Sequence, residues 1–528
     1  MDKNNYNFPK EMFEFANKGE KLHDQKFEDK PIGYFKDAWI RFRKNKASIV
    51  AAIIIIGIVL FSLMMPLFNS RYDSSFLDVY YAKKGPYSDW WSENVGIMNG
   101  GTKRNMSERG LAWVLATGMG AEHTRENLAS GKKVTVADGL ESKYSAVIKY
   151  KDGGKGPDGK DIFKAKVNTF MEVGFVYITV EQHEFQKILD WEKENGIQVL
   201  YPIIDNNEYT YKPIDVTNAN YWYKTNGRGD PIKVNADGSE TRISIKDKAS
   251  FEDNYKRDAE GNEVYFEYTG GGSLDTAQYK IRVLYYNYYI YQNGFAPSYI
   301  FGTDSQGYDL ALRMADGIKL SLLVSLTVSF INFFIGAIYG AIAGYYGGVV
   351  DLTMERITDI LAGIPSIVVM TLFQMHLAQK VGVIPSLLFA FVLTGWIGMS
   401  SRVRTQFYRF KNQEYVMAAR TLGARDRRII WKHIFPNTLG TIITGSVLAI
   451  PGVIFTESML SFLGIVNLGG AETTSLGTLL SDASNIWTNY PHLMLFPAMI
   501  ISLLMICFNL FGNGLRDAFN PSLRGVEE

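Results

Sequence analysis

The feature that most constrains this chain is an apolar run at residues 47–68 that contains no charged residue and no histidine. Folded as one helix, this run of about 22 residues covers roughly 33 Å at about 1.5 Å per residue, which is enough to cross a hydrocarbon core of about 30 Å. A cleaved signal peptide is disfavoured, because the run is too long for the apolar part of such a peptide and no small-x-small cleavage site precedes Asn69. The sequence therefore predicts a membrane-spanning helix.

Five more apolar segments follow in the last part of the chain, so we expect six membrane spans in all. Most of these segments contain Gly, Ala or Ser at close spacing, as at residues 336–341, and small residues favour the close approach of helices in lipid. The five further spans are expected at residues 320–346, 357–377, 384–399, 438–465 and 493–511.

The positions of Lys and Arg predict the orientation of the chain in the membrane. A basic cluster at residues 41–46 precedes the first span, and nine Lys and Arg stand against two acidic residues at 402–432, between the fourth and fifth spans. Because basic residues favour the cytoplasmic side, both segments are expected there, and the four spans between them agree with this. We therefore expect both termini in the cytoplasm and residues 69–300 and 466–492 outside it.

The long polar stretch at residues 69–300 has the pattern of a folded domain. Alternating apolar and polar residues at 175–180 and 280–285 predict strands, and residues 184–194 predict a helix. The Tyr-rich stretch at 285–291 is expected to be a strand with one face in the core, the alternative being a binding platform for a peptide or a partner. The sequence thus predicts an inserted α+β domain.

Charge and composition exclude several classes of site. The 55 Lys and Arg and 54 Asp and Glu nearly balance, which is unlike a nucleic-acid-binding protein. The single cysteine, Cys507, excludes a disulfide framework, and the six histidines include no pair at helical spacing that would suggest a metal site. Residues 154–161 have the spacing of a phosphate-binding loop, but Asp161 stands where a hydroxyl should meet Mg²⁺, so a hairpin loop is expected.

The basic segment near residue 420 has a pattern of its own. Residues 414–422 predict a short helix that Gly423 can end in a left-handed turn, and a second amphipathic helix is expected to run to Pro436, where the next span begins. With the small residues Ala418 and Ala419 on one side, such a helical turn offers a compact knob that another protein could hold. The alternative is a basic cytoplasmic loop with incidental helicity.

This segment resembles the coupling loop of ABC-transporter permeases, which has the pattern Glu-Ala-Ala, three residues, Gly, nine residues, Ile-x-Leu-Pro. Here the pattern begins at Met417 in place of Glu, and it also departs from the family at His433 and Phe435. The resemblance implies that the loop contacts a separate ATPase subunit. The residues it assigns to this contact are Glu414, Met417, Ala418, Ala419, Gly423, Arg427 and Pro436.

Other segments resemble the C-type inner-membrane subunit of oligopeptide, dipeptide and nickel importers. The family's Leu-Gly-Thr-Asp-x-x-Gly-Arg-Asp appears as residues 301–309, with Tyr308 in place of Arg. Together the similar segments cover roughly 32–68 and 299–525, so the stretch at 69–300 lies outside the resemblance. The remaining segments that carry it are residues 37–46, 457–464, 480–482 and 508–517.

The resemblance implies an α-helical polytopic membrane protein with six spans, like an ABC importer permease, and a large α+β extracytoplasmic insert between the first and second spans. Its parts would be a cytoplasmic segment at 1–46, the first span at 47–68, the inserted domain at 69–300, and a permease core with five spans at 301–528, with the coupling loop at about 402–436 and a short cytoplasmic tail.

Five residues are expected at the extracytoplasmic mouth of the permease. The acidic residues Glu355, Asp359 and Glu457 could line the path or form packing pairs between helices, although acids at the ends of spans are commonly interfacial. The five residues assigned to the mouth are Gly302, Thr303, Asp304, Asp309 and Glu457.

The function implied is that of a multi-pass permease subunit of an ATP-driven importer that moves oligopeptides across the cell membrane by alternating access. No catalytic residue, metal or cofactor is expected on this chain, and ATP and Mg²⁺ would be held by two ATP-binding subunits. The other implied partners are a B-type permease subunit, an extracellular substrate-binding protein, a peptide substrate and membrane lipid, but no nucleic acid.

Two other functions stay open at this point. A nickel or other small-solute importer of the same family would have the same spans. A membrane-anchored enzyme or receptor would place its function in the insert, where no motif with catalytic spacing is found. We expect instead that the insert docks or caps the substrate-binding protein, because it re-enters the membrane beside the expected mouth.

Overall fold

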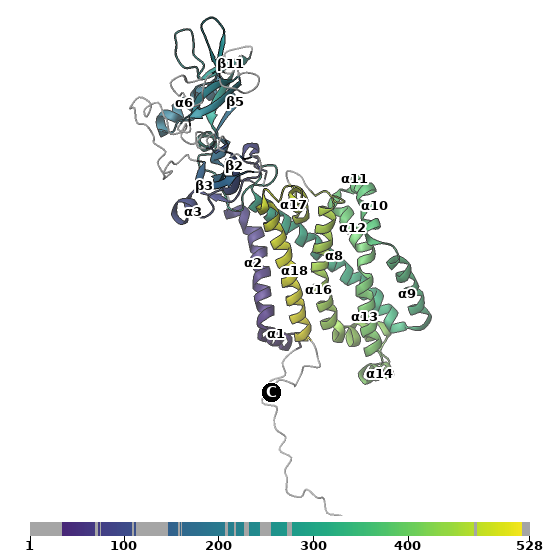
Figure 1. Ribbon diagram of the computed structural model, residues 1–528. Coiled ribbons are helices and arrows are strands. Elements are labelled where there is room, and N and C mark those ends of the chain that lie inside the picture. Colours follow the sequence, from purple (N-terminus) through teal and green to yellow (C-terminus); the bar gives the residue numbers. More distant parts are fainter. Residues whose placement is uncertain are drawn as a thin grey trace, which may run out of the picture.

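The computed structural model describes residues 34–519, except 69–71, 74, 108–109, 112–113, 115–145, 157–158, 160, 206–209, 216–217, 226–231, 243–254, 272–276 and 469–472. The expected cytoplasmic ends at residues 1–33 and 520–528 therefore lie outside the described residues. Figure 1 shows a bundle of roughly parallel helices from one end of which the insert extends away as an elongated domain.

Five helices are long and apolar enough to cross a membrane, and a bent pair of helices raises the number to six if it counts as one span. The short helix α1 (Tyr34–Lys44) precedes the first of them. The spanning elements are α2 (Lys46–Phe68), α8 (Leu310–Tyr346), α9 (Gly348–Ala362) with α10 (Ser366–His376), α12 (Val383–Gly395) with α13 (Ile397–Phe410), α16 (Phe435–Phe462) with the short α15 (Asp426–Arg428) before it, and α18 (Pro491–Phe519). The short helices α11 (Ala378–Val381) and α17 (Leu476–Ala483) lie between spans.

The bounds of the spans differ from those that the apolar runs predict. The run at 357–377 is not one straight helix, because α9 and α10 meet at 69° around Gly363 and Pro365. Proline has no N–H to continue the helical bonds and disfavours helical backbone in the residue before it. α8 starts ten residues before its expected start at residue 320, because a helix continues past its lipid-facing part wherever protein covers its polar residues.

Glycines let α8 pack closely against α13. Gly336, Gly340 and Gly344 are four residues apart and therefore lie on one face of α8. A Cβ on Gly344 would come within 2.7 Å of the carbonyl oxygen of Arg404, and a Cβ on Gly340 would collide with the carbonyl oxygen of Ser400. The backbones of the two helices thus touch, which agrees with the expectation from the small residues at 336–341.

This close approach predicts that Gly340→Ala destabilises the bundle, because the new methyl group meets main-chain atoms that cannot rotate away. Overpacking of this kind costs about 1–3 kcal/mol, so the apparent melting temperature of the purified chain should fall. Gly398→Ala is the matched control, since it is also within a spanning helix and a Cβ there meets nothing within 4 Å. Equal melting temperatures for the two variants would contradict the close contact.

The part of the insert nearest the bundle is built on a three-stranded antiparallel sheet in the order β2-β4-β3. β3 and β4 form a hairpin in which Lys155 pairs with Asp161, so the hairpin expected at residues 154–161 is confirmed. The elements of this proximal lobe are η2 (Val79–Tyr81), β1 (Tyr87–Ser88), α3 (Asp89–Val95), β2 (Gly101–Ser107), β3 (Val147–Lys155), β4 (Asp161–Asn168), η3 (Met171–Val173) and β13 (Ser298–Tyr299).

The distal lobe contains a four-stranded antiparallel sheet in which β12 pairs with β5, β6 and β11. The strands predicted at 175–180 and 280–285 and the helix predicted at 184–194 are confirmed, which makes the insert an α+β domain. Its elements are β5 (Phe175–Glu181), α6 (Gln182–Asn195), β6 (Leu200–Tyr201), β11 (Phe266–Gly270) and β12 (Gln278–Leu284), with the hairpins β7 (Thr210–Asp215) to β8 (Asn218–Thr225) and β9 (Ile232–Val234) to β10 (Glu240–Arg242).

The strand predicted for the Tyr-rich stretch is wrong, because these residues form the helix α7 (Tyr285–Asn293). Its first five residues are all buried, so no face is left for a binding platform. The Tyr289 hydroxyl donates to the Tyr72 hydroxyl at 2.8 Å, and the Tyr285 hydroxyl donates to a carboxylate oxygen of Asp78 at 2.7 Å. Burial raises the pKa of Tyr72 to about 12. Because the first five residues of α7 are buried on every side, they show no polar face that would reveal a helical period, and the strand preference of tyrosine yields to this packing.

Candidate functional site

The basic segment folds as a helix, a left-handed turn and a second helix, and we refer to residues 414–436 as the elbow. α14 (Glu414–Thr421) leads into a turn in which Gly423 has a φ of +81°. The N–H of Gly423 donates to the carbonyl of Arg420 at 3.0 Å. This bond satisfies one of the carbonyl groups that have no partner within the helix at its C-terminal end. The helix and the glycine turn that the sequence predicts are thus confirmed.

The second helix of the elbow does not end at Pro436, contrary to the expectation. It runs on without a break over Asp426–Phe462, through the π-helical segment η6 (Ile429–Ile434). The N–H of Phe435 donates to the carbonyl of Ile430, five residues back. Pro436 then falls in the first turn of α16, and the wider π turn lets the helix pass a residue that has no N–H to donate.

The inner side of the elbow is packed into the bundle. Tyr345, near the end of α8, donates a hydrogen bond from its hydroxyl to Asp426 at 2.6 Å and accepts one from Arg420 at 3.4 Å. A shared apolar cluster stabilises the same contact, so the elbow packs as one unit with α8 and α13. The buried members of this cluster are Ala337, Ala341 and Tyr345 of α8, Met399, Val403 and Phe407 of α13, Val416, Ile429, Ile430 and Ile434 of the elbow, and Ile442 of α16.

The outer side of the elbow carries the residues that the coupling-loop pattern assigns to a partner. Of that set, only Ala419 is half-buried. Leu422, whose side chain is 87% exposed at the tip of the turn, is not among the residues that the pattern assigns, although an apolar residue directly before the turn glycine is a signal for it. The assigned residues that are exposed are Glu414, Met417, Ala418, Gly423, Arg427 and Pro436.

An ion-pair cluster ties the first half of the broken span to α13. Arg404 donates to both carboxylate oxygens of Asp351, at 2.5 and 2.7 Å, and its guanidinium is also 2.5 Å from Glu355. The Tyr408 hydroxyl donates to Asp351 at 2.6 Å. Glu355 therefore forms a packing pair between helices, whereas Asp359 forms an ion pair with Arg356 of its own helix, at 3.3 Å. We refer to Asp351, Glu355, Arg404 and Tyr408 as the clamp.

Four of the five residues assigned to the mouth, at positions 302–309, form a buried, capped turn at the start of α8. A carboxylate oxygen of Asp304 accepts hydrogen bonds from the N–H groups of Gln306, Gly307 and Tyr308. Asp309 caps α8 by accepting from the N–H of Ala311 at 2.7 Å. Thr303 accepts from the N–H of Lys84 at 2.8 Å and donates to the carbonyl of Tyr81, and Gly302, with a φ of +86°, packs on the carbonyl of Lys84. This turn joins the beginning of the insert to α8.

Glu457 lies on α16 and is not part of that turn. Its side chain is 1% exposed and accepts from Ser321 of α8 at 2.8 Å and from Ser461 at 3.1 Å. A Cβ on Gly477 of α17 would collide with the carbonyl oxygen of Ser458, so α17 packs tightly at the same place. Within the described ranges, no three His, Cys, Asp or Glu side chains gather in a way that could hold a metal ion.

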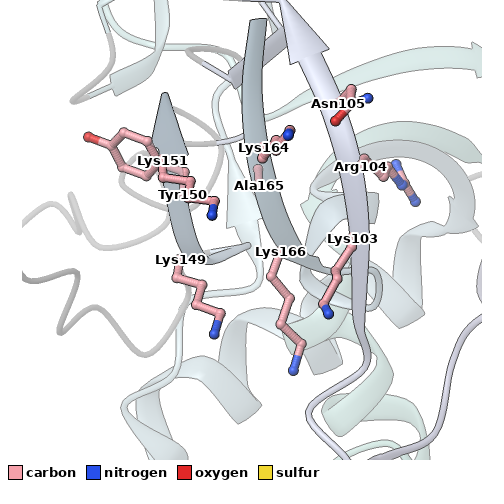
Figure 2. A pocket seen from close by; sticks show the side chains of 9 residues that line it. All are labelled: Lys103, Arg104, Asn105, Lys149, Tyr150, Lys151, Lys164, Ala165 and Lys166. Carbon is pink, nitrogen blue, oxygen red and sulfur yellow. The ribbon is translucent and has the colours of Figure 1, made fainter. Parts of the chain in front are cut away.

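One face of the proximal sheet carries a group of lysines that were not among the site residues expected from the sequence. The register aligns Lys103, Lys166 and Lys149 in a row across β2, β4 and β3, with Lys164 and Lys151 in the next row on the same face. Figure 2 shows Lys103, Lys149 and Lys166 extending side by side. They line a recess of about 530 Å³. We refer to these five residues as the lysine face.

Like charges dominate the lysine face. Burial, with the charges of Lys149 and Lys103, lowers the pKa of Lys166. In the part of the chain that the structure describes, none of the five lysines forms an ion pair. The signal in the sequence was the alternation at 149 and 151 and again at 164 and 166, which places both lysines of each strand on one face. The arrangement suits an anionic partner.

The bundle, the broken span and an elbow joined to three spanning helices define a multi-pass helical membrane protein of the permease class. The family model described as binding-protein-dependent transport system inner membrane component matches residues 310–525, and that of the N-terminal TM domain of oligopeptide transport permease C matches residues 33–86. The chain belongs to the family of oligopeptide- and dipeptide-type permease components of binding-protein-dependent transport systems. Such subunits are transport components and not enzymes.

The most informative relatives agree with this assignment. The chain is 42% identical to the oligopeptide transport system permease protein OppC of Bacillus subtilis over 225 residues, which are 42% of this chain and 72% of that protein. It is 43% identical to the dipeptide transport system permease protein DppC of Bacillus subtilis over 226 residues, 42% of this chain and 69% of the relative. The bundle is also similar to a chain of the inward-facing MetNI methionine ABC transporter, at 15% identity and a TM-score of 0.33, over 39% of this chain and 96% of that chain.

The clamp predicts that Arg404→Gln weakens the bundle. The substitution removes a bidentate pair of charge-assisted hydrogen bonds, each of which contributes about 1.5–3 kcal/mol. It also leaves the buried Asp351 carboxylate without its cation, so the apparent melting temperature should fall clearly. Arg356→Gln is the matched control, because its exposed pair with Asp359 is worth at most about 1 kcal/mol. If the two variants had the same melting temperature, the clamp would not stabilise the contact between α9 and α13.

Proposed function

We propose that this chain is the C-type permease subunit of an ATP-driven importer that moves oligopeptides across the cytoplasmic membrane by alternating access. The relatives of the permease core are subunits of oligopeptide and dipeptide transport systems, which supports peptides as the substrate. The observation that carries the mechanism is the elbow, which has an exposed outer side and an inner side packed against the spans.

In this proposal the elbow is the part that a motor subunit holds. When the two ATP-binding subunits close on ATP and Mg²⁺, they carry the outer side of the elbow with them. Val416 and Ile429 are fully buried against α8 and α13, so the displacement passes to these helices as a rigid-body motion. The clamp then carries α9 along with α13, and the bundle changes between its two openings.

The proposed complex has a second, B-type permease subunit, two ATP-binding subunits and an extracellular substrate-binding protein. The basic clusters before α2 and around the elbow support a cytoplasmic location for both, and hence for both termini. With this orientation the insert is extracytoplasmic, and the capped turn at residues 302–309 is at the outer mouth.

The elbow predicts that Gly423→Val uncouples transport. Valine is strained at a φ of +81°, although a Cβ there meets nothing within 4 Å, so the variant should keep the fold of the bundle while the turn loses its shape. We expect peptide uptake by the reconstituted complex to fall at least about tenfold, a loss equivalent to about 1.4 kcal/mol, with normal amounts of protein in the membrane.

Gly423→Asn is the control for this prediction, because asparagine tolerates the left-handed region, and it should keep most of the uptake. Co-purification of the ATP-binding subunits measures the contact itself. Uptake at the level of the unmodified chain in Gly423→Val would count against the elbow as the coupling element.

The insert is proposed to dock the substrate-binding protein through the lysine face. Five lysines without an ion-pair partner among the described residues are best complemented by an acidic surface, and opposite charges speed the encounter of two proteins. A dock close to the bundle would deliver the substrate near the turn at 302–309.

Reversing three charges of the lysine face tests this docking. In the variant Lys103→Glu, Lys149→Glu, Lys166→Glu, the concentration of substrate-binding protein needed for half-maximal uptake should rise at least about tenfold at low salt, because charge repulsion slows association. Basal ATP hydrolysis should stay unchanged. The matched control reverses Lys187 and Lys193, which are exposed on α6 of the distal lobe. An equal dependence on binding protein in both variants would contradict a dock on the lysine face.

A further inference from the structure

The short helix α3 of the proximal lobe exposes an unusual group of apolar side chains. Trp90 is 61% exposed and Trp91 43%, and Val95 and Ile97 are each about half exposed. The two indole rings meet edge to face with centroids 5.0 Å apart. Large apolar side chains that gather on one element and stay uncovered indicate a surface that contacts something apolar.

The position of α3 relative to the end of α2 indicates what its apolar surface contacts. Figure 1 shows α3 level with the upper end of α2 and clear of the helix bundle, on the side away from α18. α2 remains apolar up to its last residues, Leu67 and Phe68, which are both exposed. The boundary between lipid and water therefore lies at the height of α3, and this boundary is where tryptophan is enriched in membrane proteins.

α3 is held at this height by a firm attachment. The chain segments on either side of it are joined by the N–H of Ser88, which donates to the carbonyl of Met98 at 2.8 Å, and by that of Gly100, which donates to the carbonyl of Pro86. β1, directly before α3, pairs with β13, which leads towards α8. The ring of Tyr87 is buried against Phe170, with centroids 4.8 Å apart. The helix is thus fixed to the base of the insert.

We propose that α3 is an interfacial anchor, which lies in the headgroup region of the bilayer at the insert's end of the spans and places Trp90, Trp91 and Val95 among phospholipids. The indole ring of tryptophan suits this location, because its apolar body can enter lipid while its N–H meets headgroups and water. The anchor is independent of the transported substrate.

The anchor gives the insert a second point of support. One support is the connection of the proximal lobe to α2 and α8, and the other is the bilayer itself. A domain joined at one point can tilt, whereas two points separated along the membrane restrict its tilt. The lysine face, which is part of the same lobe, is then presented in a constant direction relative to the bundle.

The single cysteine of the chain makes a depth measurement practical. In a Cys507→Ala background, Val95→Cys places one nitroxide label on α3 of the full chain. The matched control is Tyr268→Cys on β11, whose side chain is 61% exposed and which lies in the distal lobe in Figure 1. Both variants are reconstituted in nanodiscs of phosphatidylethanolamine and phosphatidylglycerol, and power saturation compares the access of oxygen, which concentrates in lipid, with that of a water-soluble nickel complex.

We expect the ratio of oxygen access to nickel access to be several-fold higher at residue 95 than at residue 268. Adding Trp90→Gln and Trp91→Gln to the Val95→Cys variant should lower the ratio towards that of the control. The same two substitutions are also added to the Tyr268→Cys variant, where an unchanged label spectrum verifies that the insert stays folded. Equal ratios at 95 and 268 would overturn the anchor. So would a label at 95 that is shielded from both reagents only when other subunits are present, because α3 would then be covered by protein.

Discussion

The mechanical coupling that we propose depends on the burial of the inner side of the elbow. Val416, Ile429 and Ile434 have no exposed surface, and they pack against helices that belong to two different spans. Packed side chains transmit a displacement because the interior has no free volume to absorb it. The hydrogen bonds of Tyr345 to Asp426 and Arg420 then fix the direction of the elbow as well as its distance from α8. The outer side remains free to present Leu422 and Met417.

The insert does not separate the two spans that it connects, because its two ends are brought back together. The aromatic cluster around Tyr72, Tyr289 and Tyr299 joins the chain that leaves α2 to the chain that enters α8. Farther out, Phe175 pairs with Leu284 across β5 and β12, so the distal lobe too begins and ends at one place. An inserted unit whose ends are adjacent adds a domain without stretching the spans that it interrupts.

Local patterns in the sequence predict a large part of this fold, and contacts between distant segments account for what they miss. The spans, the β-strands near residues 175 and 280 and the turn at Gly423 follow from hydropathy, alternation and the freedom of glycine. The lysine face needs the register of three strands drawn from residues 101–168, and the clamp needs Arg404 to meet Asp351, so neither is visible in one segment. The same holds for α7, whose tyrosines are covered by residues from both ends of the insert.

The π-helical segment explains why the prediction failed at Pro436 and what the failure reveals. In an α-helix, Ile429 and Ile434 would be turned about 140° from each other, at about 100° per residue, and only one of them could face the bundle. The wider π turn, whose hydrogen bonds join residues five apart, brings both closer to the same side, and both are fully buried. The irregular turn is therefore the conformation that buries the elbow's isoleucines, and it also carries the chain past Pro436. The π segment lies between α14 and α16, so its register sets how α14 is oriented relative to α16. The same six residues therefore determine both the attachment of the elbow and the start of α16.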